Sequence, residues 1–136
     1  MIYSRDGGTT WSATATQPFA NDEDIKSCQW FELDSETERW IVGLKAPSSA
    51  QGKVAYSDDQ GATWITANVG GASAGRGSTV GGTLHVVDAT DIWLASAGGY
   101  IFKSEDGGAT WVAQEQGAIT TDAYSHIHFI GDREVS

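Results

Sequence analysis

The chain has 136 residues, of which 40% are hydrophobic, and 18 acidic residues outnumber 8 basic ones to give a formal charge of −10. This length corresponds to one domain, and the apolar content is high enough to bury a core, which excludes a wholly disordered chain. The acidity argues against nucleic acid or an anionic membrane as a partner, and the single cysteine excludes an intrachain disulfide or a cysteine-based zinc site.

An eight-residue pattern, S-x-D-x-G-x-T-W, occurs three times in the chain. The Asp side chain folds back onto backbone N–H groups to hold a turn, and the Gly permits a positive φ. The Trp opens the returning strand and buries a large ring. We therefore predict a β-hairpin at each copy, with the Asp as a turn-former and not a catalyst. The pattern residues are Ser4, Asp6, Gly8, Thr10, Trp11, Ser57, Asp59, Gly61, Thr63, Trp64, Ser104, Asp106, Gly108, Thr110 and Trp111.

The flanking residues repeat with the pattern and divide the chain into units of four short strands, here called a, b, c and d in chain order. Residues 1–14 are predicted to hold strands c and d of one unit, joined by the first hairpin. Residues 25–67 and residues 82–114 each form a complete unit. Residues 126–136 start a further unit and hold its strands a and b. Four strands over about 40–50 residues is the size of one blade of a β-propeller.

The tryptophans fall at defined places in these units. The Trp that closes each pattern is expected to pack between neighbouring units. Trp40 and Trp93 each begin strand b and are interpreted as equivalent core residues. Trp30 has no counterpart, which makes it the best candidate for a partly exposed aromatic residue, although burial is expected for it too.

The repeated pattern resembles the Asp-box, or BNR, repeat of sialidases, sortilin, xyloglucan-cleaving hydrolases and the photosystem II assembly factor family. Residues 91–111 are most similar to the repeat of the last of these families. The resemblance covers nearly the whole chain and implies an all-β fold, a β-propeller of four-stranded antiparallel blades. It also implies that the Asp-boxes lie on the blade periphery, away from any active site. Because one propeller fold carries many activities, the resemblance indicates fold and not function.

The arginines argue against sialidase activity. Sialidases with this repeat use an arginine triad, a Tyr–Glu pair and an acidic catalyst. The chain has four arginines, Arg5, Arg39, Arg76 and Arg133, and Arg5 lies inside an Asp-box. The arginine motif that precedes the sialidase repeats is absent.

The strand count predicts an incomplete ring. Residues 1–14 and 126–136 together make one blade, so the chain holds about three blades, whereas propellers have about four to eight. The sequence therefore predicts either a homodimer, in which two copies complete each other's split blade in a six-bladed ring, or a piece of a larger propeller protein. Two-fold symmetry is the commonest arrangement of homo-oligomers.

Candidate ligand-binding residues lie on the face of the propeller opposite the Asp-boxes, or along its central channel. Arg76 lies in a Gly-rich connector, and Tyr124 and Trp30 are aromatic residues suited to stacking on a sugar ring. His85, His126 and His128 fall on predicted innermost strands. Their expected role is polar lining of the channel and not metal binding.

These observations favour a non-catalytic binding or scaffold module that recognises a protein or a glycan partner. The alternatives are a sialidase-like glycoside hydrolase, which needs two carboxylates about 5–10 Å apart, and an incomplete fragment. No catalytic residue, metal site or cofactor is predicted. Neither a signal peptide nor an apolar run long enough to span a bilayer is visible, so the sequence indicates no compartment.

Overall fold

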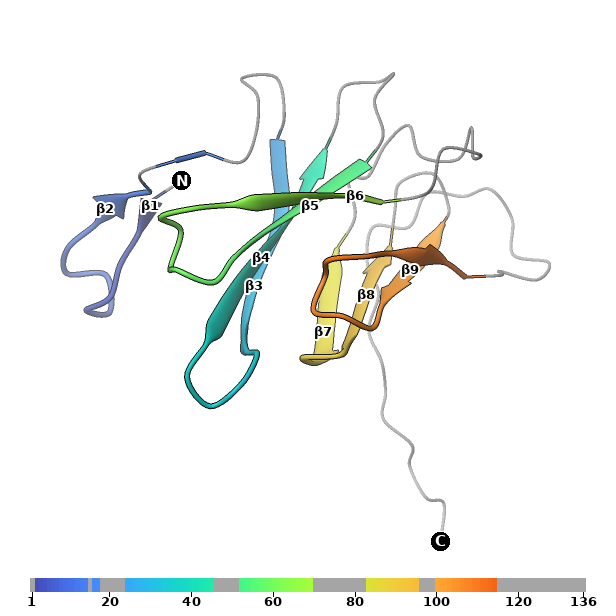
Figure 1. The fold of residues 1–136 in the computed structure, drawn as a ribbon. Helices are drawn as coiled ribbons and strands as arrows, with labels where there is room; N and C mark the ends of the chain where they lie inside the picture. Colours follow the sequence, from blue (N-terminus) through green and yellow to red (C-terminus); the bar gives the residue numbers. More distant parts are fainter. Residues whose placement is uncertain are drawn as a thin grey trace, which may run out of the picture.

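The structure is a computed structural model that describes residues 2–14, 16–17, 24–45, 52–69, 83–95 and 100–114. Every regular element in these ranges is a β-strand, and the strands form three antiparallel sheets that lie side by side (Figure 1). The prediction of an all-β fold with four-stranded antiparallel sheets is confirmed.

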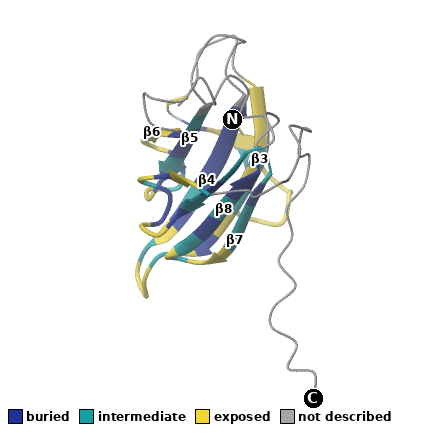
Figure 2. Cartoon of the chain, turned by 90° about the vertical axis from the view of Figure 1, so that its right-hand side faces the viewer, coloured by how far each residue is buried: buried dark blue, intermediate teal, exposed yellow. Residues whose placement is uncertain are grey.

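Each sheet follows the order of the chain. The strands are β1 (Ile2–Tyr3), β2 (Ser12–Ala13), β3 (Asp24–Glu32), β4 (Glu38–Lys45), β5 (Gly52–Ser57), β6 (Ile65–Val69), β7 (Leu84–Asp88), β8 (Asp91–Ala95), β9 (Ile101–Ser104) and β10 (Val112–Ala113). The first sheet pairs β1 with β2, the second runs β3-β4-β5-β6, and the third runs β7-β8-β9-β10. Buried residues are concentrated in β4 and β8, in the middle of the larger sheets (Figure 2).

Alternation along the strands gives each sheet two different faces. In the β3–β6 sheet, Phe31 and Ile41 lie on one face, here called the forward face. Cys28, Trp30 and Val42 lie on the other, here called the rear face. The same two names apply to equivalent positions of the other sheets.

The strand register shows that Trp40 and Trp93 are not equivalent. Trp40 lies opposite Ser57, the first residue of its Asp-box, whereas the residue opposite Ser104 is Ile92. Trp93 lies opposite Lys103 and therefore corresponds to Ile41, which is on the forward face. The sequence-based equivalence was wrong by one residue, and a slip of one residue moves a side chain to the opposite face of a sheet.

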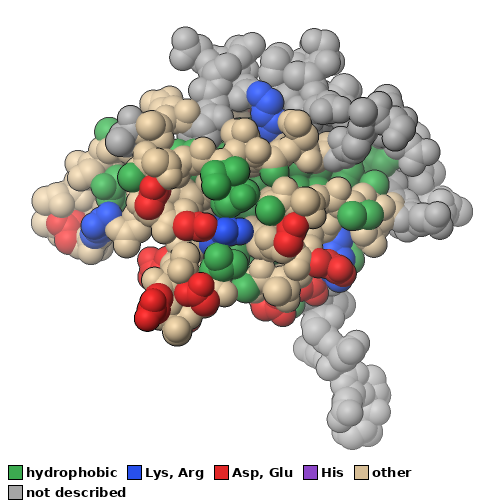
Figure 3. Space-filling model, viewed as in Figure 1, with side chains coloured by type: hydrophobic (Ala, Val, Ile, Leu, Met, Phe, Trp, Pro, Cys, Tyr) green, Lys and Arg blue, Asp and Glu red, His purple; other side chains and the backbone are tan. Residues whose placement is uncertain are grey.

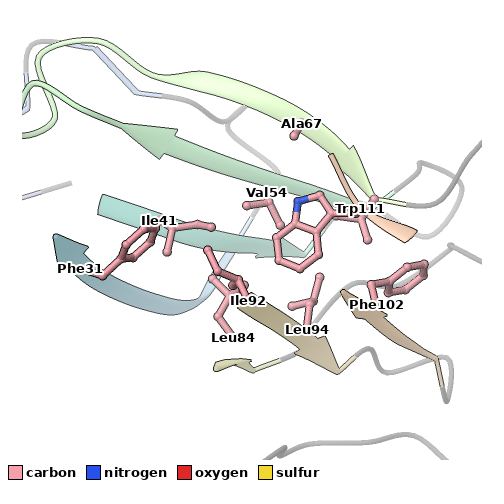
Figure 4. Close-up of a cluster of buried hydrophobic side chains, with 10 residues drawn as sticks. Phe31, Ile41, Val54, Ala67, Leu84, Ile92, Leu94, Phe102 and Trp111 are labelled. Carbon is pink, nitrogen blue, oxygen red and sulfur yellow. The ribbon is translucent and has the colours of Figure 1, made fainter. Parts of the chain in front are cut away.

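The sheets pack head to tail. The forward face of the β3–β6 sheet covers the rear face of the β7–β10 sheet, and together they form the main core (Figure 4). This core contains Phe31, Ile41, Val54, Ala67, Val69, Leu84, Ile92, Leu94, Phe102 and Trp111. The same relation holds one unit earlier, where Tyr3 of β1 contacts the rear-face residue Trp40 with ring centroids 5.5 Å apart. In both cases a forward face lies against the rear face of the unit that follows it.

Two glycines of the Asp-box turns test this packing. Gly8 and Gly108 have almost the same positive φ, +91° and +94°, so alanine is strained equally at both positions. A Cβ at Gly108 would lie 2.6 Å from Ile41 Cδ1, whereas a Cβ at Gly8 would meet only Trp11, at 3.8 Å. In dilute protein we expect Gly108→Ala to lower the free energy of unfolding by about 1 kcal/mol more than Gly8→Ala, the lower end of the cost of overpacking, because the atom in the way is the terminal methyl group of Ile41. Urea unfolding measures the difference, and equal effects would contradict the contact between the sheets.

Candidate functional site

The three Asp-box turns share one hydrogen-bond network. Asp6 Oδ1 accepts from Ser4 Oγ and from the Thr10 amide, both at 2.8 Å, and Asp6 Oδ2 accepts from Thr10 Oγ1 at 2.6 Å. Ser4 Oγ in turn accepts from the Gly8 amide at 2.8 Å. The same bonds recur around Asp59 and Asp106, with distances of 2.5–2.9 Å. Both carboxylate oxygens of each Asp are therefore occupied within its own turn.

These bonds keep the Asp-box carboxylates ionised. The hydroxyl and amide of Thr10, followed by the Ser4 hydroxyl, lower the pKa of Asp6 from 3.8 to about 2. Thr63 lowers the pKa of Asp59 in the same way. Burial acts in the opposite direction at Asp106, but the bonds from Thr110 and Ser104 still leave its pKa lowered. A carboxylate with so low a pKa does not donate a proton at neutral pH, so these residues lack the chemistry of a general acid.

The lowered pKa values link stability to pH. Between its ordinary pKa of 3.8 and about 2, Asp6 is protonated in the unfolded chain and ionised in the fold. The unfolded state then binds more protons, so stability rises with pH in this window and is lost on acidification through it. We expect Asp6→Asn to flatten the dependence of the melting temperature on pH between about pH 4 and pH 2. An unchanged slope would contradict the role of this carboxylate in the turn.

A groove of about 620 Å³ opens between the β1–β2 sheet and the rear face of the β3–β6 sheet, and is here called the aromatic groove. Its lining includes Ile2, Tyr3, Ile25, Trp30 and Trp40. Trp30 is 63% exposed, so the expectation of burial for this residue was wrong. No strand among the described residues covers the rear face of β3, and the large apolar side chain of Trp30 is therefore exposed to solvent.

The tryptophans of the three Asp-boxes differ in how far they are buried. Trp111 is buried in the main core and Trp64 is half-buried, but Trp11 is 62% exposed. The expectation that each of them packs between units is therefore wrong for Trp11 in the single chain. Trp11 is exposed because, in the described part of the chain, no sheet lies against the rear face of β1–β2.

Cys28 lies in the aromatic groove with its side chain exposed. Desolvation by its surroundings raises the pKa of the thiol. A reactive thiolate needs the opposite shift, so Cys28 is not an activated nucleophile.

A second, acidic pocket of about 370 Å³ lies at the turn between β3 and β4. Glu32, Asp34, Glu36, Glu38 and Asp58 contribute to its lining, and acidic side chains gather at this turn in Figure 3. The sequence interpretation did not single out these residues, although the alternating acids from 32 to 38 are visible in the sequence. Asp34 Oδ1 accepts from the amides of Glu36 and Thr37, which holds the turn and lowers the pKa of Asp34.

Arg39 lies beside this pocket and joins two sheets. Its Nε and Nη2 donate to Asp58 at 2.6 and 2.7 Å, and its Nη1 donates to the carbonyl oxygen of Gly107 at 2.9 Å. The guanidinium lies 4.2 Å from the ring centroid of Tyr56. The bonds to Asp58 raise the pKa of Arg39 further. This buried residue was counted in the sequence only as one of four arginines, since its partners are 19 and 68 residues away in the chain.

The ligand-binding candidates from the sequence are only partly placed. Trp30 lines the aromatic groove, and His85 is half-buried on β7. The two do not share a site, because Trp30 is on a rear face and His85, opposite Trp93, is on a forward face. Arg76, Tyr124, His126 and His128 lie outside the described residues, as does the predicted half blade at residues 126–136.

No three His, Cys, Asp or Glu side chains among the described residues are placed to hold a metal ion. No helix in the described part of the chain is long and apolar enough to cross a membrane.

Comparison with known proteins gives one match. Residues 2–13 match the family model of the BNR/Asp-box repeat. No curated protein and no solved structure matches the chain. The matched residues are β1, the first Asp-box turn and β2, and the turns at Asp59 and Asp106 reproduce the hydrogen bonds of that first turn. Residues 2–13 of this chain are therefore similar to the BNR/Asp-box repeat.

Proposed function

We propose that this chain is a β-propeller-type module built from Asp-box repeats, which binds a protein partner through the aromatic groove and carries no reaction of its own. The observation that carries this proposal is that both carboxylate oxygens of Asp6, Asp59 and Asp106 are used inside their own turns. The repeats therefore hold the scaffold together. Successive sheets that pack through the same two faces support a propeller-type arrangement.

The described residues that line the aromatic groove do not include the carboxylate pair that a glycosidase uses. Retaining and inverting glycosidases both use two carboxyl groups on either side of the scissile bond, one of them protonated. Among the described lining residues of the groove, Glu38 is the only acid. One carboxylate does not supply both the acid and the base or nucleophile of that reaction.

The surroundings of the groove favour a protein over a glycan. Ile2 and Ile25 give it an apolar lining next to the aromatic rings. In the described part of the chain β1 pairs only with β2, so the other edge of β1 presents unpaired backbone N–H and C=O groups. An added polypeptide strand pairs with such an edge while its side chains fill the groove, and a sugar has no equivalent row of donors and acceptors.

Fluorescence titration separates protein binding from glycan binding. Purified protein is titrated with 3′-sialyllactose and with a xyloglucan heptasaccharide to millimolar concentration, and we expect no change in tryptophan emission. Quenching that disappears in Trp30→Ala and persists in Trp11→Ala would show that the groove binds sugar and would overturn the choice of a protein partner. Trp11 is the matched control because it is as exposed as Trp30 and lies outside the groove.

A hydrolysis assay tests the absence of a reaction. A panel of 4-methylumbelliferyl glycosides, the sialoside included, is expected to release no fluorophore above the buffer rate. Turnover that is lost in Glu38→Gln would overturn the proposal and favour a glycoside hydrolase. The variant Glu36→Gln, at the exposed turn beside it, is the matched control.

A further inference from the structure

We propose that the aromatic groove binds an arginine side chain of the protein partner, with the guanidinium group lying over Trp30 and bonded to Glu38. This inference rests on the proposed function, since it names the chemistry by which the groove recognises that partner. The arginine belongs to an extended segment that pairs with the unpaired edge of β1, and it enters the groove together with an apolar side chain two residues away in the same segment.

Three aromatic rings from two sheets line the groove. Trp30 and Trp40 lie directly opposite each other on β3 and β4, so their side chains are neighbours on the rear face. Tyr3 approaches Trp40 from β1 with an angle of 70° between the two ring planes. Trp30 is 63% exposed, which leaves a large ring open to a ligand. Because the face of an aromatic ring is negative, rings around an open space are suited to an organic cation.

Carboxylates lie next to these rings on the same face of the sheet. Glu38 lines the groove and stands two residues before Trp40, on the same side of β4. Glu32 lies directly opposite Glu38 and two residues after Trp30. Like charges at opposite positions destabilise a pair of strands, and no lysine or arginine among the described residues pairs with either glutamate. A cation bound beside them relieves this repulsion.

The chain holds one of its own arginines in the same way. Arg39 lies 4.2 Å from the ring centroid of Tyr56 and donates two hydrogen bonds to Asp58. The aromatic groove offers a ring and a carboxylate of the same kinds, and in the described part of the chain no cation lies over Trp30 or Trp40. The groove therefore has the two partners of a guanidinium group without the group itself.

The shape of the guanidinium group favours arginine over lysine. It is planar, so it stacks on an indole ring, and its fork of donors matches a carboxylate, whereas an ammonium group is a compact point charge. The formal charge of −10 also attracts a cationic segment from a distance.

Arg5 is the one cation among the described lining residues of the groove, and it does not occupy the proposed site. Its guanidinium lies 5.3 Å from the ring centroid of Tyr3. Its positive charge at the groove opposes the binding of a second cation, which gives the proposal a test of sign.

Titration with a matched pair of peptides tests the proposal. Two hexapeptides of alternating threonine and valine, acetylated and amidated at their ends, differ only at the fourth position, which holds arginine in one and citrulline in the other. Citrulline has the shape of arginine without its charge. Isothermal titration calorimetry of the full chain is expected to give a Kd for the arginine peptide about tenfold below that for the citrulline peptide, because only the arginine makes the cation–π contact and the ion pair.

Single substitutions locate the binding site. Trp30→Ala and Glu38→Gln are each expected to raise the Kd of the arginine peptide about tenfold. Trp11→Ala and Glu36→Gln are the matched exposed controls and are expected to leave it unchanged. Glu38→Gln removes one of two opposed carboxylates, so we expect it to raise the melting temperature, which separates lost binding from lost folding.

Arg5→Gln measures the effect of charge at the groove. Removal of this cation is expected to lower the Kd of the arginine peptide about threefold at low salt, and the gain is expected to shrink at high salt because salt screens exposed charges. The citrulline peptide is expected to show neither effect. A weaker arginine peptide in this variant would contradict the position of the bound cation.

Equal binding of the two peptides, or an arginine peptide whose affinity Glu38→Gln does not change, would overturn the assignment of an arginine. Binding of neither peptide at millimolar concentration would overturn it as well. Failure of this inference is distinct from failure of the proposed function. Sugar binding or glycoside turnover overturns that function, whereas equal binding of both peptides keeps a protein partner and rejects only its charge.

Discussion

Trp111→Ala is expected to lower the free energy of unfolding by about 3–5 kcal/mol, the range for a buried aromatic residue replaced by alanine. Trp111 is 8% exposed and packs in the core between the β3–β6 and β7–β10 sheets, with its Nε1 donating to the Gly108 carbonyl oxygen at 2.9 Å. The substitution removes the ring, and with it this hydrogen bond and part of the packing between the two sheets. Urea unfolding of dilute protein, followed by circular dichroism, measures the loss.

Trp11→Ala is the matched control for this substitution. Trp11 occupies the same place in its Asp-box and donates to the Gly8 carbonyl oxygen at 3.1 Å, but it is 62% exposed. In dilute protein its loss is expected to change stability by about 0.5 kcal/mol or less, as for other surface substitutions. Trp64, which is half-buried, is expected to fall between the two. Equal losses at Trp11 and Trp111 would contradict the difference in packing between the units.

Arg39→Ala is expected to cost about 1–3 kcal/mol, because the carbonyl oxygen of the buried residue Gly107 loses its donor, whereas the carboxylate of Asp58 that is left behind is exposed to solvent. The substitution removes two bonds to Asp58, the bond to the Gly107 carbonyl oxygen and the stacking on Tyr56. Arg39→Lys is expected to recover only part of this, since an ammonium group does not reproduce the fork of donors. Thermal unfolding and urea unfolding, both carried out in the same buffer, measure the stability of the two variants.

Lys26→Ala is the control for Arg39. Lys26 pairs with Asp24 at 3.3 Å on the surface, and exposed ion pairs contribute about 0–1 kcal/mol. A cost at Arg39 as small as that at Lys26 would mean that the link between the two sheets adds little to stability.

The hairpins and strands were predictable because their causes are local. The hydrogen bonds of the Asp-box turn join residues at most four apart, as in the bonds from Ser4 to Asp6 and from Thr10 to Asp6. The eight-residue pattern therefore contains the whole network. The four-stranded sheets follow from strands that pair with their neighbours in the chain. Blade arrangement and ring closure depend on contacts between units, and they stay predictions.

The features that could not be predicted from the sequence depend on strand register and on contacts between residues far apart in the chain. Trp40 and Trp93 look equivalent in a linear alignment, but the pairing of each with its own Asp-box strand separates them by one position. The role of Arg39 could not be predicted from a sequence motif, because the carbonyl group that it contacts belongs to a residue 68 positions away. Trp30 was expected to be buried, since a single sequence does not show whether a sheet lies over a given face.

The head-to-tail packing of the sheets makes the contact between units directional. A forward face meets a rear face, so a stack of units always ends in one face of each kind and never in two that are alike. Such a contact either closes on itself or continues without limit, and the angle between successive sheets decides which. Substitutions that change this angle and leave the contact intact are thus expected to convert closed assemblies into filaments.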